Sequence, residues 1–320
     1  MKYYAGLDIG GTVARMKIEY ADGRAGEFYG AGGTMNTDGY EKCNAKYQSF
    51  ILPILEEAQI KAEDCVKICV AASGIDSPRQ EEECRRSFLE MGFRPESILV
   101  YNDCEVFLHV STGPAIVLVC GTGSIAYARG ESGAITRCGG WGHVLSDEGS
   151  GHNMGMKVIR EAANHIDGRT RCPILYELFE AQSGLKTLDE INTFVNDMLM
   201  EKTQIASFAP LAEKAYELGD ETGLKILREC RDELFALVKD VYYKADLDRY
   251  QKEAPVELWL WGSVLLKNKI IAPELTDLLK KEFPSIQIRI PEKTALDTAL
   301  DIASHKEKPQ GSRITGCPAA

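Results

Sequence analysis

The chain has 320 residues, of which 44% are hydrophobic and 27% charged, the balance of a soluble globular protein. This length exceeds what one compact core usually holds, so two domains are expected. The formal net charge of −11 disfavours a nucleic-acid partner, because a phosphate backbone repels an acidic face. It leaves nucleotide binding open, since a few backbone N–H groups and a metal ion suffice to hold phosphates.

The N-terminal stretch MKYYAGLDIGGT does not have the pattern of a signal peptide, because its apolar run is short and Asp8 interrupts it. No apolar run approaches the ~20 residues that span a bilayer. Ten cysteines without a secretion signal indicate reduced thiols. Cys65 and Cys69, which flank VKI, are expected to be buried rather than to bind a metal. We therefore expect a cytoplasmic protein without a membrane or nucleic-acid partner.

The first third of the chain is predicted to form strands covered by helices. Strands are expected over residues 2–9, 13–20 and 24–30, with a glycine bend after the first and a turn at Asp22 and Gly23 after the second. Apolar side chains recur with helical spacing over residues 40–58. A buried strand (65–73), a charged amphipathic helix (79–91) and a strand (96–103) that ends at Asp103 follow.

A second set of elements begins at residue 115 and repeats this order. Strands over 115–120, 125–130 and 134–137 are again separated by a glycine bend and a turn, which indicates an internal duplication. The remaining predicted elements are a helix (150–167), a mostly helical stretch (173–247), a strand (256–263), a helix (274–283), a strand (286–290) and a last helix (293–305).

Strands that alternate with helices predict an α/β fold. We place two domains at residues 1–112 and 113–306, with the junction near residues 111–114. The second domain is expected to contain a helical subdomain over 173–247. Its last helix packs either within that domain or back on the first domain. Residues 307–320 are expected to form a disordered tail.

The first candidate site is the bend within GLDIGGT, residues 6–12. Its two glycines let backbone N–H groups approach an anion, and the hydroxyl of Thr12 adds a donor. Asp8, at the end of the preceding strand, is a candidate Mg²⁺ ligand, through water because Mg²⁺ keeps much of its hydration shell. An ordinary hairpin turn explains the segment about equally well when it is taken alone.

The second candidate site is the bend within CGTGSI, residues 120–125, where Thr122 and Ser124 are donors. Two such bends at equivalent places of a repeat can cradle the phosphates of one nucleotide. A third bend, WGSV at residues 261–264, gives room for an adenosine to lie against the backbone. By itself this third segment is more typical of a plain strand-to-helix turn.

The loop GGWGHVLSDEGS at residues 139–150 is a candidate wall for a sugar. Its glycines and tryptophan make a rigid surface that a ligand can approach closely, and Asp147 is suited to accept hydrogen bonds from sugar hydroxyls. Alternatively, Ser146 or Asp147 caps the following helix and Glu148 compensates its dipole, although capping needs neither glycines nor tryptophan. His143 and His152 are expected to pack or cap, because two histidines without a third ligand make no convincing zinc site.

Asp103 is the candidate catalytic base. A kinase that acts on an alcohol needs a carboxylate to accept the hydroxyl proton, and fixed cations and donors to hold the transferring phosphoryl group. Asp103 lies between the two bends in sequence, where a turn residue after a strand is the plain alternative. Asn36, Ser73 and Gly74 follow strands on the same side of the first domain and are candidate sugar contacts, although each alone is more typical of a turn.

Together these segments resemble the N-acetylglucosamine kinase family, within the BadF/BadG ATPase group of the actin, heat-shock chaperone and sugar-kinase superfamily. The resemblance runs from residue 6 to about residue 303 and is most specific in GGWGHVLSDEGSG. It implies two duplicated ribonuclease-H-like, actin-like ATPase domains with a helical insertion in the second, which close over the substrate. It also implies ATP and Mg²⁺ as cofactors, a homodimer, and γ-phosphoryl transfer to an amino sugar, with the 6-hydroxyl of N-acetylglucosamine as the first candidate acceptor.

The resemblance also assigns roles to single residues, with Asp103 as the general base. The positions that match the nucleotide site are Gly10, Gly11, Thr12, Gly121, Thr122, Gly123, Gly262, Ser263 and Lys267. The positions that match the sugar pocket are Asn36, Ser73, Gly74, Asp103, Gly140, Trp141, Gly142 and Asp147.

Three positions depart from the pattern of the family. Ile125 stands where N-acetylglucosamine kinases carry an asparagine near the sugar, Ala14 replaces a frequent hydroxyl residue, and Thr294 replaces a common glycine. The first departure leaves the sugar open among N-acetylglucosamine, glucosamine, N-acetylmuramic acid and glucose.

Two other classes of function are alternatives. Some ATPases of the same group activate acyl-CoA dehydratases and reductases through an iron–sulfur cluster, one ligand of which is a cysteine before a GTG-type turn, as Cys120 is. The GGQD-type stretch of those ATPases is missing here. A sugar sensor without turnover is disfavoured by the presence of Asp8, Thr12, Thr122 and Asp103.

Overall fold

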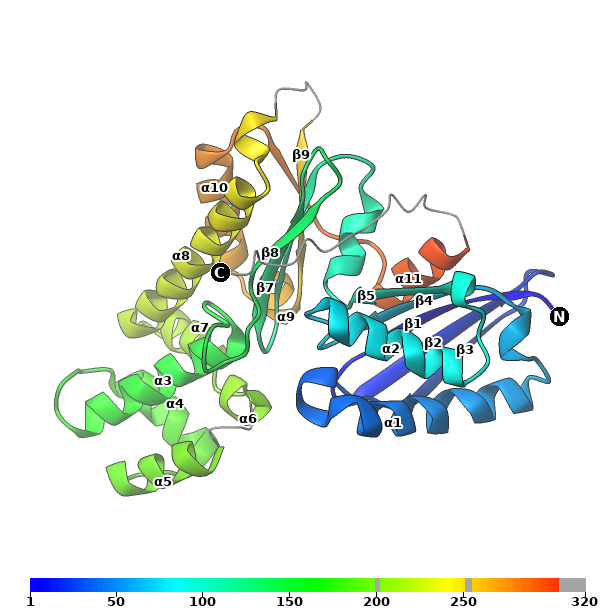
Figure 1. The fold of residues 1–320 in the computed structure, drawn as a ribbon. Coiled ribbons are helices and arrows are strands. Elements are labelled where there is room, and N and C mark those ends of the chain that lie inside the picture. The colour runs from blue at the N-terminus through cyan, green and yellow to red at the C-terminus, as the bar shows by residue number, and fades with distance from the viewer. Residues whose placement is uncertain (199–201, 251–254, 305–320) are drawn as a thin grey trace. The chain divides into compact units, whose positions relative to one another are not determined.

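The structure, a computed structural model, describes residues 1–198, 202–250 and 255–304, so the predicted tail over 307–320 lies outside the described residues (Figure 1). The chain divides into two compact units. Unit 1 contains Met1–Pro114, Arg129–Thr136 and the chain from Pro291, and unit 2 contains Ala115–Ala128 and Arg137–Ile290.

Unit 1 is built on a five-stranded sheet with the order β3-β2-β1-β4-β5. Its strands are β1 (Tyr3–Ile9), β2 (Val13–Tyr20), β3 (Ala25–Ala31), β4 (Cys65–Ala72) and β5 (Ile98–Asn102). Strand β1 is antiparallel to β2 and parallel to β4, and β4 is parallel to β5. Ile9 is in register with Ala72, and Ala72 with Asn102, so the segments that follow these three strands emerge at one edge of the sheet.

The helices of unit 1 are α1 (Met35–Glu57), α2 (Pro78–Glu90), α11 (Ala295–Ala303) and the short 3-10 helices η1 (Ala62–Asp64), η2 (Pro95–Ser97) and η3 (Glu105–Val110). Helix α1 begins at Met35 rather than at the predicted residue 40, and it is kinked at Gly39, whose backbone is not helical (φ 72°). Thr294 caps α11, since its side chain accepts a hydrogen bond from the Asp297 N–H. Helix α11 packs on β1 and β4, and Gly6 permits this, because a Cβ there would lie 2.4 Å from the Leu300 nitrogen.

Unit 2 contains most of the second five-stranded sheet, which has the order β10-β9-β6-β7-β8. Its strands are β6 (Ala115–Cys120), β7 (Ser124–Arg129), β8 (Ile135–Gly139), β9 (Val256–Trp261) and β10 (Ile286–Arg289). In chain order this is the same arrangement as in the first sheet: third, second, first, fourth, fifth. The predicted α/β class is confirmed, whereas the duplication and the helical insertion stay predictions.

The helices of unit 2 are α3 (Gly151–Ile166), α4 (Pro173–Ser183), α5 (Leu188–Met198), α6 (Lys202–Ala206), α7 (Pro210–Glu217), α8 (Glu221–Lys244), the 3-10 helix η4 (Leu247–Arg249), α9 (Ser263–Lys267) and α10 (Ile271–Glu282). The N-cap of α3 is Ser150, whose hydroxyl accepts a hydrogen bond from the Asn153 N–H. The alternative in which Ser146 or Asp147 caps this helix is therefore wrong. The short helix α9 was not expected, since five residues are too few to show a helical period.

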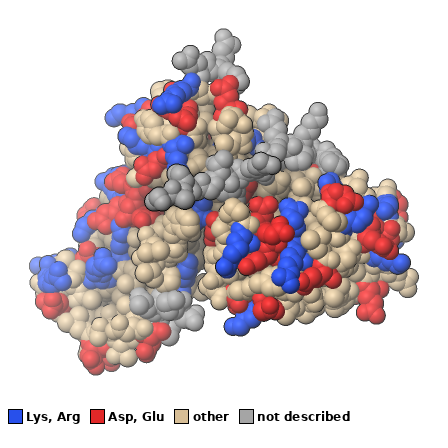
Figure 2. Space-filling view, in the orientation of Figure 1, with Lys and Arg blue, Asp and Glu red and all other residues tan. Residues whose placement is uncertain are grey.

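On the face drawn in Figure 2, acidic and basic side chains of the described residues are interspersed over both units. Within the part of the chain that the structure describes, no helix has the length and apolar composition needed to cross a membrane.

Candidate functional site

The ends of the parallel strands of unit 1 bring Ser73 and Asp103 together. The N–H of Ser73 donates to the carbonyl of Ile9 (2.8 Å), and the N–H of Asp103 donates to the carbonyl of Ala72 (3.3 Å). Both predicted residues therefore lie at the sheet edge where β1 runs into the first glycine bend at Gly10. Sheet register, rather than sequence proximity, creates this juxtaposition.

Asp103 has an environment suited to a general base. Its side chain is partly buried, and burial raises its pKa to about 6, with further contributions from the negative charges of Asp8 and Asp76. Hydrogen bonds from Cys104 oppose the shift. A carboxylate with a pKa closer to neutral pH holds a transferred proton better than an ordinary aspartate does.

Asp8 lies on β1 with a carboxylate that is only 12% exposed. Burial raises its pKa, and the charge of Arg15, whose Nη2 donates to Asp8 Oδ2 at 2.6 Å, works against that shift. Among the described residues, no group of three or more histidine, cysteine or acidic side chains is placed to hold a metal ion. One carboxylate at this edge fits Mg²⁺ that arrives with a nucleotide, because such an ion is held mainly by phosphate oxygens and water.

The first glycine bend is held in place by a glycine pair that the sequence reasoning missed. The N–H of Gly32 donates to the carbonyl of Thr12 (3.0 Å), and the N–H of Gly33 donates to the carbonyl of Gly10 (3.0 Å). A Cβ at Gly32 would lie 2.1 Å from the Gly10 oxygen, so this contact requires glycine. The N–H of Gly10 itself donates to the Val13 carbonyl (2.9 Å), which leaves Gly11 and Thr12 as the members of the bend suited to face a phosphate.

A polar cluster next to Asp103 contains the predicted sugar contact Asn36. Its amide donates to Asp76 Oδ2 and accepts from the Gln80 side chain. The amide of Asn102 donates to Asp76 Oδ1 (3.4 Å). Asp76, Gln80 and Asn102 were missed, although Asn102 ends β5 and Asp76 closely follows β4, positions where ligand contacts often occur in such sheets.

Gly74 is placed close to this cluster by its backbone conformation. Its φ is +80°, and a Cβ there would lie 3.0 Å from Thr34 Oγ1 and 3.2 Å from the Asn36 nitrogen. The close approach brings the β4–α2 loop against the N-terminus of α1, so Gly74 is needed to assemble the polar cluster.

A buried pair, Glu105 and His109, lies on η3 directly after Asp103. Both side chains are at most 4% exposed, and neither has a hydrogen-bond partner among the described residues. Glu105 Oε1 lies 4.0 Å from His109 Nε2. Burial raises the pKa of Glu105 to about 8, with a contribution from Glu81, and lowers the pKa of His109 to about 4, with a contribution from Arg129. At neutral pH the pair is therefore a neutral acid beside a neutral imidazole rather than an ion pair.

We predict that Glu105→Gln stabilises the protein more at pH 8 than at pH 5. The folded state keeps the Glu105 proton up to a pKa of about 8, above the ordinary 4.5, so stability falls as pH rises through this window. Glutamine removes that loss, and the gain at pH 8 should reach about 2–4 kcal/mol, with little change at pH 5. Urea unfolding of both proteins at pH 5 and pH 8 measures this change in the free energy of unfolding. The exposed Glu63→Gln serves as control, and a gain independent of pH would contradict the prediction.

In unit 2 the second glycine bend is attached to the start of α3. The N–H groups of Gly151 and His152 donate to the carbonyls of Gly121 (2.8 Å) and Thr122 (3.0 Å). The N–H of Gly121 donates to the carbonyl of Gly123 (2.9 Å), which closes the turn. The bend is thus a rigid structure.

Gly262, predicted to lie near the nucleoside, supports the same bend from β9. Its φ is +103°, and a Cβ would lie 2.3 Å from the Cys120 oxygen. Any side chain here would push β9 away from the residue that precedes Gly121. Glycine is therefore required at this position by packing alone.

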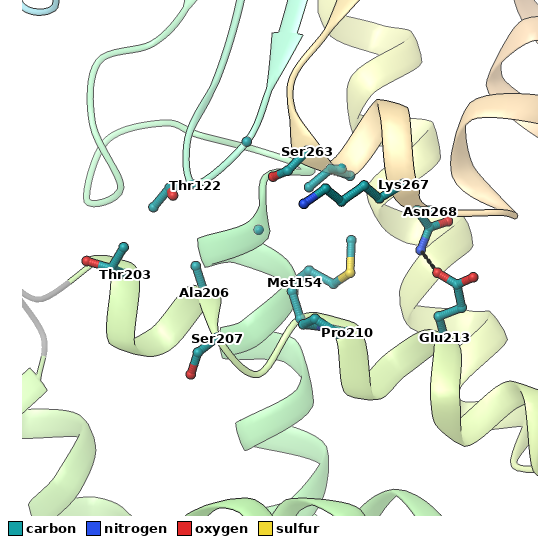
Figure 3. Close-up of a pocket in the computed structure, with 14 residues that line it drawn as sticks. Thr122, Met154, Thr203, Ala206, Ser207, Pro210, Glu213, Ser263, Lys267 and Asn268 are labelled. Carbon is teal, nitrogen blue, oxygen red and sulfur yellow. Dashed lines mark hydrogen bonds between the residues drawn. The ribbon is translucent and has the colours of Figure 1, made fainter. Parts of the chain in front are cut away.

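A cavity of about 520 Å³ opens beside this bend (Figure 3). Of the predicted nucleotide residues it brings together Gly121, Thr122, Ser263 and Lys267, whereas Gly123 and Gly262 are not among its lining residues. The lining residues that were missed come from α3, α6, α7, α9 and adjoining loops: Gly151, Met154, Thr203, Ala206, Ser207, Ala209, Pro210, Glu213, Val264 and Asn268.

The two ends of the cavity differ in chemistry. The hydroxyl groups of Thr122 and Thr203 lie at one end, and the Asn268 amide, which donates to Glu213 Oε2 at 2.8 Å, lies at the other (Figure 3). Met154, Ala206 and Pro210 form an apolar side between them. An apolar slot with polar groups at its ends suits a nucleoside whose phosphates point toward the threonines.

The predicted sugar wall is partly exposed. Trp141 is 58% exposed, and the Arg137 guanidinium lies 3.8 Å from the centre of its ring. Ile125 packs beneath the wall, since a Cβ at Gly140 would lie 2.4 Å from Ile125 Cδ1. Ile125, which departs from the family pattern, therefore lies directly against the wall. Gly142 lies in the wall loop itself.

Asp147 lies beneath the second bend rather than on the open side of the wall. It is 3% exposed, has a φ of +67°, and its Oδ1 accepts from the Ser124 N–H at 3.3 Å. A Cβ at Gly123 would lie 2.9 Å from the same oxygen. The rings of His143 and His152 pack against each other at 4.7 Å, in agreement with a packing role.

Comparison with known proteins extends this description. The sequence model of the BadF/BadG/BcrA/BcrD ATPase family matches residues 5–300. A protein of Clostridium acetobutylicum named N-acetylmuramic acid/N-acetylglucosamine kinase is 29% identical over 291 residues, 90% of this chain and 94% of that protein. The N-acetyl-D-glucosamine kinase of Dictyostelium discoideum is 27% identical over 69% of this chain and 70% of its own length.

Solved structures share the fold. A protein of Chromobacterium violaceum proposed to be an N-acetylglucosamine kinase superposes with a TM-score of 0.70 at 22% identity, covering 95% of this chain and 99% of that chain. The ROK hexokinase of Thermus thermophilus gives a TM-score of 0.53 at 14% identity, covering 95% and 98%. At these identities the likeness establishes the fold alone.

Proposed function

Because this chain belongs to the BadF/BadG/BcrA/BcrD ATPase family, we propose that it is an ATP-dependent kinase that phosphorylates an amino sugar, first N-acetylglucosamine, with Asp103 as the general base. Two relatives that span most of the chain are named as kinases of N-acetylated amino sugars. The prediction of a carbohydrate kinase is confirmed at this level. The particular sugar, the 6-hydroxyl acceptor and the residue roles are part of the proposal.

The observation that carries the proposal is the position of Asp103. A partly buried carboxylate with a pKa of about 6 lies at the sheet edge next to the first glycine bend and beside the Asn36 cluster. A sugar bound by the Asn36 cluster would present a hydroxyl to this carboxylate. The cavity of about 520 Å³ in unit 2 has a size suited to a nucleoside.

The proposed reaction follows from these groups. Asp103 accepts the proton of the sugar hydroxyl while the hydroxyl oxygen attacks the terminal phosphorus, and the leaving oxygen departs with ADP. Thr122, which lines the cavity, is proposed to hold phosphate oxygens, and Ser263 and Lys267, which also line it, are proposed to contact the nucleoside. The first glycine bend is proposed to contribute Gly11 and Thr12 as further phosphate contacts. Mg²⁺, when bound near Asp8, supplies positive charge to the phosphates.

The sugar is the part of the proposal that needs a direct test. The two relatives that span most of the chain are named for N-acetylated amino sugars, which favours a substrate with an acetamido group over one with a bare amine or hydroxyl. ADP release should be measured with Mg-ATP and N-acetylglucosamine, glucosamine, N-acetylmuramic acid or glucose. We expect the highest kcat/KM with N-acetylglucosamine and a phosphate on its 6-hydroxyl by NMR. ADP release no faster with any sugar than without one would overturn the proposal.

The iron–sulfur alternative is disfavoured by the surroundings of Cys120. This residue is fully buried, and its thiol lies 3.5 Å from the Gly149 carbonyl oxygen. Burial raises its pKa well above the ordinary value, whereas a cluster ligand must be a thiolate. The homodimer and the cytoplasmic location stay predictions.

A further inference from the structure

The carbonyl groups of the second glycine bend accept hydrogen bonds from backbone N–H groups that could otherwise bind a phosphate. A helix N-terminus ordinarily attracts anions through its first N–H groups. In α3 the N–H groups of Gly151 and His152 donate to carbonyls of the bend, and the N–H of Asn153 donates to Ser150 Oγ. These three N–H groups are therefore engaged within the protein, so a side chain is a suitable further source of positive charge for the phosphates at this end of the cavity.

Two lysines come into question, Lys267, which lines the cavity, and Lys202, on the helix α6 that contributes Thr203 and Ala206 to the lining. Lys267, on α9, lines the cavity beside Ser263 (Figure 3). Lys202, on α6, directly precedes Thr203, whose hydroxyl lies with that of Thr122 at the end opposite Glu213 (Figure 3). Lys202 is not itself a lining residue, but it belongs to the helix that contributes Thr203 to this end of the cavity.

The ammonium group of Lys202 lies between the bend and the wall. Its Nζ is 3.4 Å from Asp147 Oδ2, and Asp147 packs beneath Gly123. The same Nζ lies 3.8 Å from the position of a Cβ at Gly142, in the wall loop. The Lys202 side chain is 41% exposed and makes one hydrogen bond within the described residues, so two of its three N–H donors can serve a ligand.

We propose that Lys202 is a further catalytic residue, whose ammonium group contacts the terminal phosphate of the bound nucleotide. This inference rests on the proposed kinase function. During transfer the bond between the terminal phosphorus and the bridging oxygen of ADP breaks, the bond to the sugar oxygen forms, and Asp103 takes the hydroxyl proton. Lys202 keeps its protons and stabilises the charge on the transferring oxygens, where a fixed cation is most effective.

Nucleotide binding tests the contact without turnover. Calorimetric titration of the full chain with Mg-ATP and with Mg-ADP, in the absence of sugar, isolates the terminal phosphate. We expect Lys202→Met to weaken ATP binding by about tenfold and to leave ADP binding within about twofold, because only ATP has the phosphate that Lys202 contacts. An unchanged ratio of the two dissociation constants would overturn the proposal.

Kinetics test the catalytic role. With N-acetylglucosamine, Lys202→Met should lower kcat by about 10²–10³-fold and change the KM of the sugar by less than about threefold. Lys202→Arg should recover part of the loss, because it keeps the charge. Lys225→Met is the matched control, since Lys225 pairs with Glu161 in the same unit (3.1 Å) and should show normal turnover when replaced.

A merely structural role through Asp147 gives a different result. If Lys202 served only to hold Asp147, Lys202→Met would have no added effect in an Asp147→Asn background; we expect the loss of kcat to persist there. If the unaltered protein phosphorylates none of the four sugars, the proposed function fails, and the ATP and ADP titrations still decide whether Lys202 contacts the terminal phosphate.

Discussion

Asp103→Asn is expected to lower kcat by about 10³-fold while the KM of the sugar changes by less than about threefold. Asparagine keeps the size and hydrogen-bonding capacity of the side chain but cannot accept the hydroxyl proton. The N–H of residue 103 would still donate to the Ala72 carbonyl, so the sheet edge should keep its geometry. Steady-state ADP release over a range of sugar concentrations measures both constants.

The pH dependence of the same variant tests whether Asp103 acts as the general base. In the unaltered protein kcat/KM should fall as pH drops below about 6, because protonated Asp103 cannot accept a proton. The residual kcat/KM of Asp103→Asn should not show this fall at low pH. Asp277→Asn, at an exposed position of α10, should be normal in both measurements. Turnover near the unaltered level in Asp103→Asn would remove Asp103 from its proposed role.

Gly262→Ala is expected to destabilise the protein by at least about 3 kcal/mol and to weaken ATP binding by more than tenfold. Alanine at a φ of +103° is strained, and its Cβ would lie 2.3 Å from the Cys120 oxygen. Relief of that clash must shift β9 away from β6, and with it Ser263 and Lys267 at the cavity. Urea unfolding and calorimetric titration with ATP measure the two effects.

Gly133→Ala is the matched control, because it introduces backbone strain at a positive φ without a steric clash. Gly133 also has a positive φ, +81°, but a Cβ there would meet nothing within 4 Å. Its replacement should cost only about 1 kcal/mol, and ATP binding should stay normal. Equal losses of stability in the two variants would mean that the contact with Cys120 is unimportant and would contradict the argument for Gly262.

Several parts of the candidate site could be predicted because their signals are local in sequence. The bends at Gly10–Thr12 and Gly121–Gly123 stand out because glycines interrupt runs of strand residues. Asp103 could be chosen because it follows a predicted strand at a proposed domain junction. The family resemblance then joined these segments into one proposed function, and the match over residues 5–300 confirms the family.

Other parts could not be predicted because they depend on segments that meet only in the folded chain. Asp76 and Gln80 reach Asn36 because the β4–α2 loop packs against α1. The apolar side of the cavity comes from α3, α6 and α7, where Met154, Ala206 and Pro210 are ordinary residues of amphipathic helices by sequence. No local pattern distinguishes such residues from other core or surface positions.

The amino-acid sequence alone determined the α/β class and the strand-end bends and offered Asp103 as the candidate base, because glycine conformational freedom and hydrophobic periodicity act over a few neighbouring residues. Only the tertiary structure could show that Asp147 lies beneath Gly123, that Gly262 supports Cys120, and that Asp103 has a raised pKa. Burial and electrostatic interaction depend on distances in space, which the sheet register and helix packing set and the sequence does not display.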